Sequence, residues 1–302
     1  MHIFVSGLLN VETTSSVRGF PVNYYPIDYN FFGIRSAVSG VAFNIAKALR
    51  TLGDDVHLHS MVGNDFSASF ILDTVTKLGI DTASIHKVLP ETPASVVLYD
   101  PDGRRQIYCD LKNIQETSCD FQPEQLDGAD LVVACNINFN RPLLHLAKLA
   151  GKKIATDVHV LSDIYDDYNK EFMECADILF FSDENIGDNY GSFLWELAHT
   201  YHPEIIVLGR GSKGAAMYLR DTDEIIQMSA VSTGNVVNSV GAGDALFSAF
   251  IHYYAKGYNA WDALHRAQIF AAHKITVSGA SEGFVSESLI EQWLGAAGSG
   301  TR

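Results

Sequence analysis

The chain is poor in the features that mark metal-binding, secreted and membrane proteins. Its 302 residues include four cysteines, which show no CxxC pairing and no neighbouring histidine pattern. This argues against a zinc site and for reduced thiols. No window approaches the roughly 20 apolar residues of a membrane span. The first residues, Met1–Gly7, lack the basic stretch of a signal peptide. We therefore expect a cytoplasmic location and no membrane partner.

Basic side chains are also scarce. The chain has 21 lysines and arginines against 36 aspartates and glutamates, which gives a formal net charge of -15. Such a surface repels nucleic acid and anionic lipid, so we expect neither as a partner. Any phosphate site must then be built locally, from backbone N–H groups and a metal ion.

Two nucleotide-binding motifs are missing. The chain has no Gly-x-x-x-x-Gly-Lys-[Ser/Thr] loop, which excludes a Walker-type kinase. It also has no Gly-x-Gly-x-x-Gly after its first apolar run, which counts against a dinucleotide-dependent dehydrogenase.

Short apolar runs alternate with helix-length amphipathic segments along most of the chain. The stripe of Val41, Ile45 and Leu49 predicts a helix over Val41–Leu52, which Gly53 ends. The same pattern predicts helices at Phe66–Leu78, Pro142–Ala150, Phe193–Tyr201, Asp244–Tyr254 and Ala260–Val277, and strands at Ile3–Val5, Val56–Met61, Leu131–Ala134, Lys153–Asp157, Ile178–Phe181 and Ile205–Leu208. This alternation predicts a three-layer, doubly wound α/β fold with a mostly parallel sheet, whose ligands bind beyond the carboxyl ends of the strands.

Two segments interrupt the alternation and predict a second, smaller sheet. Asn10–Phe32 is rich in Thr, Ser, Tyr, Asn and Phe, and Ala94–Asp110 has Asp-Pro-Asp-Gly between two β-like runs, a strong hairpin signal. We expect a small β lid at residues 10–32 and 93–111. It would be inserted into a large α/β domain at residues 1–9, 33–92 and 112–302. A pair of ordinary surface loops is the alternative.

The segment Gly241-Ala242-Gly243-Asp244 directly precedes an apolar helix and predicts an anion-binding site. A helix start exposes unpaired N–H groups, and glycines let a phosphate approach them. Asp244 could then accept a proton from a substrate hydroxyl. Alone, an Asp in a first helical turn can equally serve only the helix dipole.

Other small-residue loops support the first interpretation. Gly40 opens a helix in which Asn44 lies one turn along and can bind a polyol. Asn10 and Glu12 alternate onto one side of the chain and suit vicinal hydroxyls, although solvation of a loop is the alternative. Gly209–Gly214 is a glycine-rich turn that could hold a nucleotide, or could be a simple hairpin.

Taken in order, these motifs resemble those of the ribokinase-like, or PfkB, family of carbohydrate and nucleoside kinases, over nearly the whole chain. The family signature Asp-Thr-x-Gly-Ala-Gly-Asp resembles Asn238–Asp244. A Gly-Gly-x-x-x-Asn-x-Ala motif resembles Ser39–Ala46, and a Thr-x-Gly-x-x-Gly turn resembles Gly209–Gly214. The resemblance implies a ribokinase-like α/β domain with a small β lid, and a homodimer formed through that lid.

The resemblance also implies roles for individual residues. Asp244 would be the catalytic base, and the N–H groups of Gly241, Ala242 and Gly243 would bind the transferring phosphoryl group. The remaining roles would be substrate binding by Asn10, Glu12, Gly40 and Asn44, and ATP binding by Gly209, Gly211, Ser212, Gly214 and Gly279. Mg²⁺ would bridge the ATP phosphates.

Departures from the family pattern concern the metal and cation positions. Asn238 stands where an Asp helps to hold a monovalent cation in ribokinase, so activation by potassium is left open. The Asn-x-x-Glu motif linked to Mg²⁺ should fall at Ser182–Asn185, where only Asp183 and Glu184 could substitute. Ser39, Glu12 and Gly209 also differ from the usual residues. We expect an atypical member of the family.

The function that the sequence favours is ATP-dependent transfer of the γ-phosphate to a primary hydroxyl of a sugar or nucleoside. A sugar-phosphate kinase is the alternative within this class and would need basic residues for the substrate phosphate. The candidates, each of which could instead be a solvated or lid-surface charge, are Arg18, Arg35, Arg104, Arg105 and Arg141. A non-catalytic sensor of sugars or nucleotides on the same fold is a second alternative. Lid aromatics could stack a nucleobase or pack a dimer contact: Phe20, Tyr24, Tyr25, Tyr29, Phe31 and Phe32.

Overall fold

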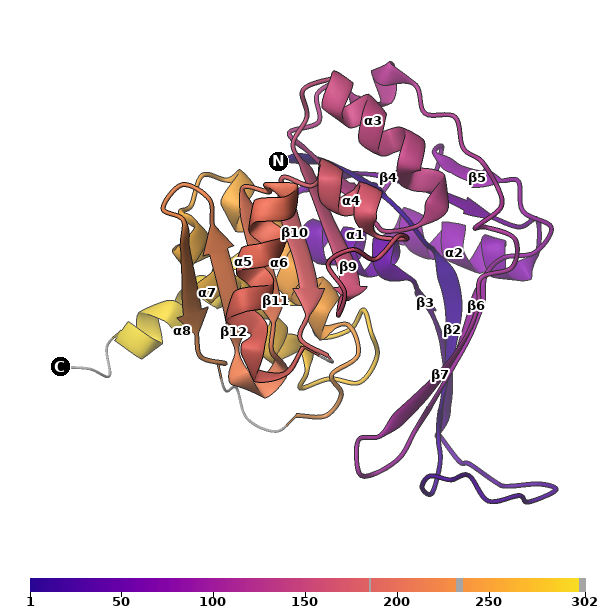
Figure 1. Ribbon diagram of the computed structural model, residues 1–302. Helices are drawn as coiled ribbons and strands as arrows, with labels where there is room; N and C mark the ends of the chain where they lie inside the picture. Colours follow the sequence, from indigo (N-terminus) through magenta and orange to yellow (C-terminus); the bar gives the residue numbers. More distant parts are fainter. Residues whose placement is uncertain (185, 232–235, 299–302) are drawn as a thin grey trace.

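A computed structural model describes residues 1–184, 186–231 and 236–298 of the chain. Its body is a nine-stranded sheet between two layers of helices (Figure 1). In spatial order the strands are β13 (Glu224–Met228), β12 (Ala215–Leu219), β11 (Ile205–Gly209), β10 (Ile178–Ser182), β9 (Ile154–Val160), β8 (Leu131–Ala134), β1 (His2–Ser6), β4 (Asp55–Val62) and β5 (Ile85–Lys87). Neighbouring strands from β11 to β5 are parallel, and β12 and β13 add an antiparallel edge.

The helices divide between the two faces of this sheet. They are α1 (Val41–Leu52), α2 (Phe66–Lys77), α3 (Arg141–Leu149), α4 (Lys170–Cys175), α5 (Tyr190–Tyr201), α6 (Ala242–Ala255), α7 (Ala260–Lys274) and α8 (Glu287–Gly298). Helices α1, α2, α6, α7 and α8 contribute to one buried apolar cluster, and α3, α4 and α5 contribute to another. The predicted three-layer α/β fold is confirmed.

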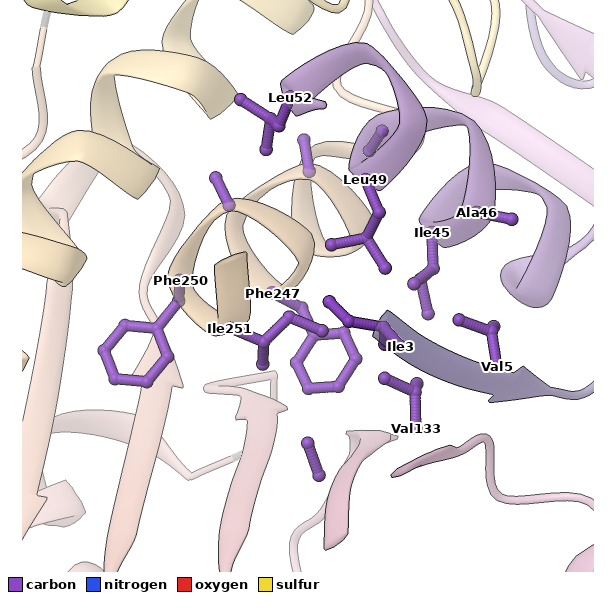
Figure 2. Close-up of a cluster of buried hydrophobic side chains, with 14 of the residues drawn as sticks. Ile3, Val5, Ile45, Ala46, Leu49, Leu52, Val133, Phe247, Phe250 and Ile251 are labelled. Carbon is purple, nitrogen blue, oxygen red and sulfur yellow. The ribbon is translucent and has the colours of Figure 1, made fainter. Parts of the chain in front are cut away.

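Strand β1 shows how the pattern of the sequence produces the layers. Ile3 and Val5 point into the first cluster, where Phe247 of α6 packs beside them (Figure 2). Phe4 points into the second cluster. Successive side chains of a strand face opposite sides of a sheet, so a continuous apolar run is what a strand covered on both faces requires.

A separate four-stranded sheet extends away from the body (Figure 1). Its order is β3 (Ile34–Ser39), β2 (Asn10–Ser16), β6 (Ala94–Tyr99) and β7 (Arg105–Asp110). The predicted hairpin at Asp100–Gly103 is confirmed, because β6 and β7 pair antiparallel around it. Strands β2 and β6 pair in parallel.

Strand β3 lies in residues that we had placed in the large domain. It belongs instead to the small sheet, where it pairs antiparallel with β2 from Asn10 opposite Ser39 to Ser15 opposite Ile34. The backbone hydrogen bonds of an exposed strand need a partner, and β2 offers one directly. The pairing also brings Asn10 to the end of β3, one residue before Gly40.

Candidate active site

The residue that precedes helix α6, Gly241, has no room for a side chain. Gly241 has φ 78°, and a Cβ at this position would collide with the carbonyl oxygen of Ala280. Within the described residues, no side chain caps this helix start. The first N–H groups of a helix have no partner inside the helix, so those of Gly243 and Asp244 are available to an anion. Asp244 lies half-buried in the same first turn.

The start of helix α1 meets the start of α6. Asn44 Nδ2 donates a hydrogen bond of 2.7 Å to Asp244 Oδ2, between residues 200 positions apart. Gly40 precedes α1 with φ 100°, and a Cβ there would collide with the carbonyl oxygen of Leu8. The chain therefore passes closely over the end of β1, and this fixes Asn44 beside Asp244.

Strand β2 brings two further polar side chains to the site. Asn10 is buried, and its Nδ2 donates to Ser95 Oγ at 3.0 Å. Glu12 accepts a hydrogen bond from Ser39 Oγ at 3.4 Å. The Oδ1 atoms of Asn10 and Asn44 are both buried, without a hydrogen-bond partner in the described parts of the chain. Buried polar atoms usually have partners, so these two acceptors fit the hydroxyl groups of a ligand.

Electrostatics make Asp244 a stronger base than an exposed aspartate. Burial raises the pKa of its carboxyl group, and the negative charge of Asp157 raises it further. The hydrogen bond from Asn44 and the electrostatic influence of His159 and Lys274 oppose this rise. These opposing interactions limit the rise of the pKa and so keep the carboxylate ionised near neutral pH. An ionised carboxylate with a raised pKa accepts a proton more readily than one with an ordinary pKa.

Three residues of this environment were not predicted from the sequence. Asp157 and His159 lie in β9, where burial raises the pKa of the Asp157 carboxyl group. Lys274 is the last residue of α7. Two of them had a signal: Asp157 follows an apolar run at the carboxyl end of a predicted strand, and Lys274 continues the apolar stripe of Ala263, Ala267 and Phe270.

The glycine-rich turn joins β11 to β12 as a hairpin, with Arg210 N–H donating to the Gly214 carbonyl oxygen at 2.8 Å. Gly209 ends β11 close to Leu246 of α6, while Gly211 and Ser212 are exposed. Gly279 follows α7 and lines a cavity of about 220 Å³ together with Glu12 and Ser39. The turn follows the carboxyl end of β11, where we expected ligands to bind, whereas the cavity lies between the small sheet and the loop after α7.

The residues expected to hold Mg²⁺ do not form a ready metal site. Asp183 lies 3.6 Å from Arg210 Nε, and Glu184 is exposed. Asn185, the last residue of the altered motif, is outside the described residues. Across residues 1–184, 186–231 and 236–298, no group of three or more His, Cys, Asp or Glu side chains could hold a metal ion. Asp183 can offer one carboxylate, as Mg²⁺ bound with phosphates requires, but Arg210 now neutralises it.

The small sheet also contacts the segment that leads into α6. Arg105 Nη1 of β7 donates to Ser239 Oγ at 3.3 Å, in the segment just before Gly241. Asn238 also belongs to this segment, where its Oδ1 accepts a hydrogen bond of 2.8 Å from Val240 N–H. The side chain of Asn238 thus shapes the loop that leads into α6.

A model of the pfkB family of carbohydrate kinases matches residues 3–287. This chain belongs to the pfkB family of carbohydrate kinases. The fructosamine kinase of Bacillus subtilis (strain 168) is 23% identical over 86% of this chain and 89% of its own length. Membership makes this pfkB-family protein a phosphotransferase with a sugar or nucleoside alcohol acceptor, and disfavours the sensor and dehydrogenase alternatives.

Solved structures agree with the fold of this pfkB-family kinase. A microbiome-derived acarbose kinase has a TM-score of 0.87 and 24% identity, covering 97% of this chain and 98% of its own. The ribokinase of Arabidopsis thaliana, solved with ribose and ATP, has a TM-score of 0.80 and 19% identity, covering 97% and 98%. In the described residues, no helix combines the length and apolar character needed to cross a membrane.

Proposed function

We propose that this pfkB-family kinase transfers the γ-phosphate of ATP to a primary hydroxyl of a sugar or nucleoside, with Asp244 as the general base. The observation that carries the proposal is the 2.7 Å hydrogen bond from Asn44 to Asp244 at the uncapped start of α6. It holds a carboxylate of raised pKa beside N–H groups that suit a phosphoryl group.

In this mechanism the acceptor hydroxyl lies against Asp244, and Asn10, Glu12 and Asn44 bind its neighbouring hydroxyls. The hydroxyl oxygen forms a bond to the γ-phosphorus as the bond from phosphorus to the β,γ-bridging oxygen breaks, and ADP leaves. The hydroxyl proton passes to Asp244. The N–H groups of Gly241, Gly243 and Asp244 stabilise charge on the transferring group, whereas that of Ala242 donates to the carbonyl oxygen of Ser239 at 3.1 Å. This electrostatic term is the largest in many phosphoryl transfers.

ATP is assigned to the Gly209–Gly214 turn, in which Gly211 and Ser212 are open to a ligand, and to the Gly279 loop. Kinases of this family generally use ATP with Mg²⁺. In our proposal Asp183 would supply a carboxylate to Mg²⁺ bound with the ATP phosphates, with exposed Glu184 next to it in the chain. When bound, Mg²⁺ neutralises phosphate charge, and no step above depends on its position.

We favour an acceptor without a phosphate group, because most arginines that could bind one are already paired. Arg18 pairs with Asp28, Arg104 with Asp100, and Arg141 with Glu171. Arg35, in the cavity wall, and Arg105 are the two that support the sugar-phosphate alternative. The related fructosamine kinase, by its name, also acts on a sugar derivative.

We further propose that the four-stranded sheet acts as the lid of the site and as the contact of a homodimer, in a cytoplasmic enzyme. Large apolar side chains of the segment after β2 are open to solvent: Phe32 is 96% exposed, Tyr24 87% and Phe31 81%. Apolar surface of this size usually marks an interaction site. We prefer a protein contact to stacking on a nucleobase, because these side chains are spread along an exposed segment.

The test is a panel of sugars and nucleosides with Mg-ATP, in which ADP release above the acceptor-free background identifies substrates. With the best acceptor, Asp244→Ala is expected to lower kcat by roughly 10²–10⁴, as for loss of a general base, with little change in acceptor binding. Asp244→Asn serves as the matched variant of equal size. A variant at Asp244 as active as the parent would show that another group takes the proton.

A further inference from the structure

Lys274 ends helix α7 with its side chain turned into the protein. The residue is 0% exposed. Its Nζ atom has no hydrogen-bond partner in the parts of the chain that the structure describes. Lysine is almost never fully buried without a partner, because removing an unpaired ammonium from water is costly. Packing therefore gives no reason for a lysine at this position, and a role in the site does.

Charged groups from several elements surround this ammonium. Asp244 of α6, Glu12 of β2 and Glu282 of the loop after α7 attract it, and Arg105 of β7 repels it. Within the described residues, none of the three carboxylates forms an ion pair with Lys274, and Glu282 pairs with Lys47 at 2.8 Å instead. The ammonium is thus an unpaired cation placed among carboxylates of the acceptor site.

Asp244 faces further charges from the sheet. Asp157 and His159 act on it from β9. The buried thiol of Cys135, which follows β8, lies near both Asp157 and Asp244, and their charges add to burial in raising its pKa. Negative charge therefore surrounds this site, from Asp157, Asp244 and Glu12. The fully buried ammonium of Lys274 opposes that charge.

We propose that Lys274 is a positioning residue for phosphoryl transfer, whose buried ammonium acts as the internal counter-ion that keeps Asp244 and Glu12 ionised. The inference rests on the proposed function of Asp244. An unpaired cation serves two carboxylates, whereas a closed salt bridge would serve one. The helix α7 that carries Lys274 packs against α6, so the position of the ammonium relative to Asp244 is fixed by the core.

The direction of the effect follows from the two charges. A nearby cation favours the ionised form of a carboxyl group and so lowers its pKa. The ammonium of Lys274 lowers the pKa of both Asp244 and Glu12, against burial, which raises both. Burial lowers the pKa of Lys274 itself to about 8, so the counter-ion is present at neutral pH and is lost as the pH rises through that value.

The first test replaces Lys274 with methionine, which has similar length and no charge. We expect the acidic limb of kcat/KM against pH to move upward by about one pH unit. The loss would then be roughly tenfold on the acidic side and would disappear at alkaline pH. Thermal stability should stay equal or rise, because an unpaired buried charge has been removed. Lys256→Met, at the opposite end of α6 in a pair with Glu287, is the matched control with an unchanged profile.

Two further measurements separate a counter-ion from a structural role. Lys274→Ala leaves a cavity, and ethylammonium chloride should restore its activity on the acidic side, whereas ethanol should not. The second measurement is a ¹³C NMR titration of ligand-free protein labelled at the aspartate carboxyl carbons. The resonance that disappears in Asp244→Asn belongs to Asp244. This resonance should titrate at higher pH in Lys274→Met than in the parent.

A uniform loss of kcat/KM at every pH, or an Asp244 resonance that titrates unchanged, would overturn the counter-ion proposal. The ligand-free titration needs no substrate, so it judges Lys274 independently of catalysis. An active Asp244→Asn enzyme would instead reject the proposed base, and this outcome can be told apart from a failure at Lys274.

Discussion

The proposed acceptor end of the site and its proposed nucleotide end are built in different ways. At the acceptor end, side chains from β2, α1, α6 and α7 converge, and Asn44 is hydrogen-bonded directly to Asp244. At the nucleotide end, one exposed hairpin turn carries most of the expected residues, and Asp183 faces Arg210. Side chains that must align for proton transfer are fixed by the core, whereas phosphate binding can rely on main-chain N–H groups that many sequences provide.

Departures from the family pattern fall on both sides of this comparison. Ser182 lies opposite Gly209 in the sheet, and Asp183 faces Arg210. Asn238 lies in the loop before Gly241, and Glu12 and Ser39 lie at the proposed acceptor end. The proposed base and its Asn44 partner keep the family residues. If the contrast is correct, substitutions at the acceptor end and at the start of α6 should have larger effects than those at the nucleotide end.

The largest effect is expected at Gly241. Gly241→Val would place a β-branched side chain at φ 78° and against the Ala280 carbonyl, which displaces the start of α6. We expect kcat to fall by roughly 10²–10³, the effect of losing such an anion-binding donor. The cost in stability is about 1–3 kcal/mol. Steady-state kinetics measures kcat, and thermal unfolding measures the loss of stability. A near-normal kcat would mean that the N–H groups at the start of α6 do not bind the phosphoryl group. Gly53→Val, also at positive φ but with open space, is the control.

Asn44→Ala should have the next largest effect. The hydrogen bond from Asn44 lowers the pKa of Asp244, so its removal raises that pKa further and moves the acidic limb of kcat/KM to higher pH. We expect a loss of roughly 10- to 100-fold below the limb, the range for a hydrogen bond to a charged group. A pH–rate profile measures it, and a loss that is the same at all pH values would assign Asn44 to acceptor binding alone.

A smaller effect is expected at Asp183. If this carboxylate assists the metal, Asp183→Asn should raise the Mg²⁺ concentration for half-maximal turnover by roughly tenfold. Arg210→Gln removes the guanidinium that neutralises Asp183 and keeps the carboxylate, so its Mg²⁺ requirement should stay at the parent value or fall. Turnover measured against Mg²⁺ concentration distinguishes the two variants. If both variants had the same Mg²⁺ requirement, Asp183 would be only the ion-pair partner of Arg210.

The smallest effect on turnover is expected in the lid. Phe32→Asp places a charge in the proposed dimer contact, and light scattering after gel filtration should show a shift from dimer to monomer at micromolar concentration. We expect kcat to change by no more than about twofold, because Phe32 makes none of the contacts of Asp244. Phe66→Asp is the control, since Phe66 is 86% exposed on α2. A parent that is monomeric would refute the contact.

Much of the fold was readable because its elements carry regular patterns. The helix predicted at Val41–Leu52 and the strand at Leu131–Ala134 are confirmed at both ends. Strand β3 was missed because Ile34–Ser39 is largely exposed and its pairing with β2 is decided by contacts distant in sequence. Strands β12 and β13 were missed because an antiparallel edge interrupts the strand–helix rhythm.

The sequence by itself determined the family, the layered α/β architecture and a short loop at Gly241–Asp244 that must begin a helix. These depend on local periodicity and on glycine positions, which each segment expresses alone. Only the tertiary structure decided that Asn44 donates to Asp244 and that the ammonium of Lys274 lies among Asp244, Glu12 and Glu282. The physical reason is that a charge acts over the distances set by packing, and packing joins residues that the chain keeps up to two hundred positions apart.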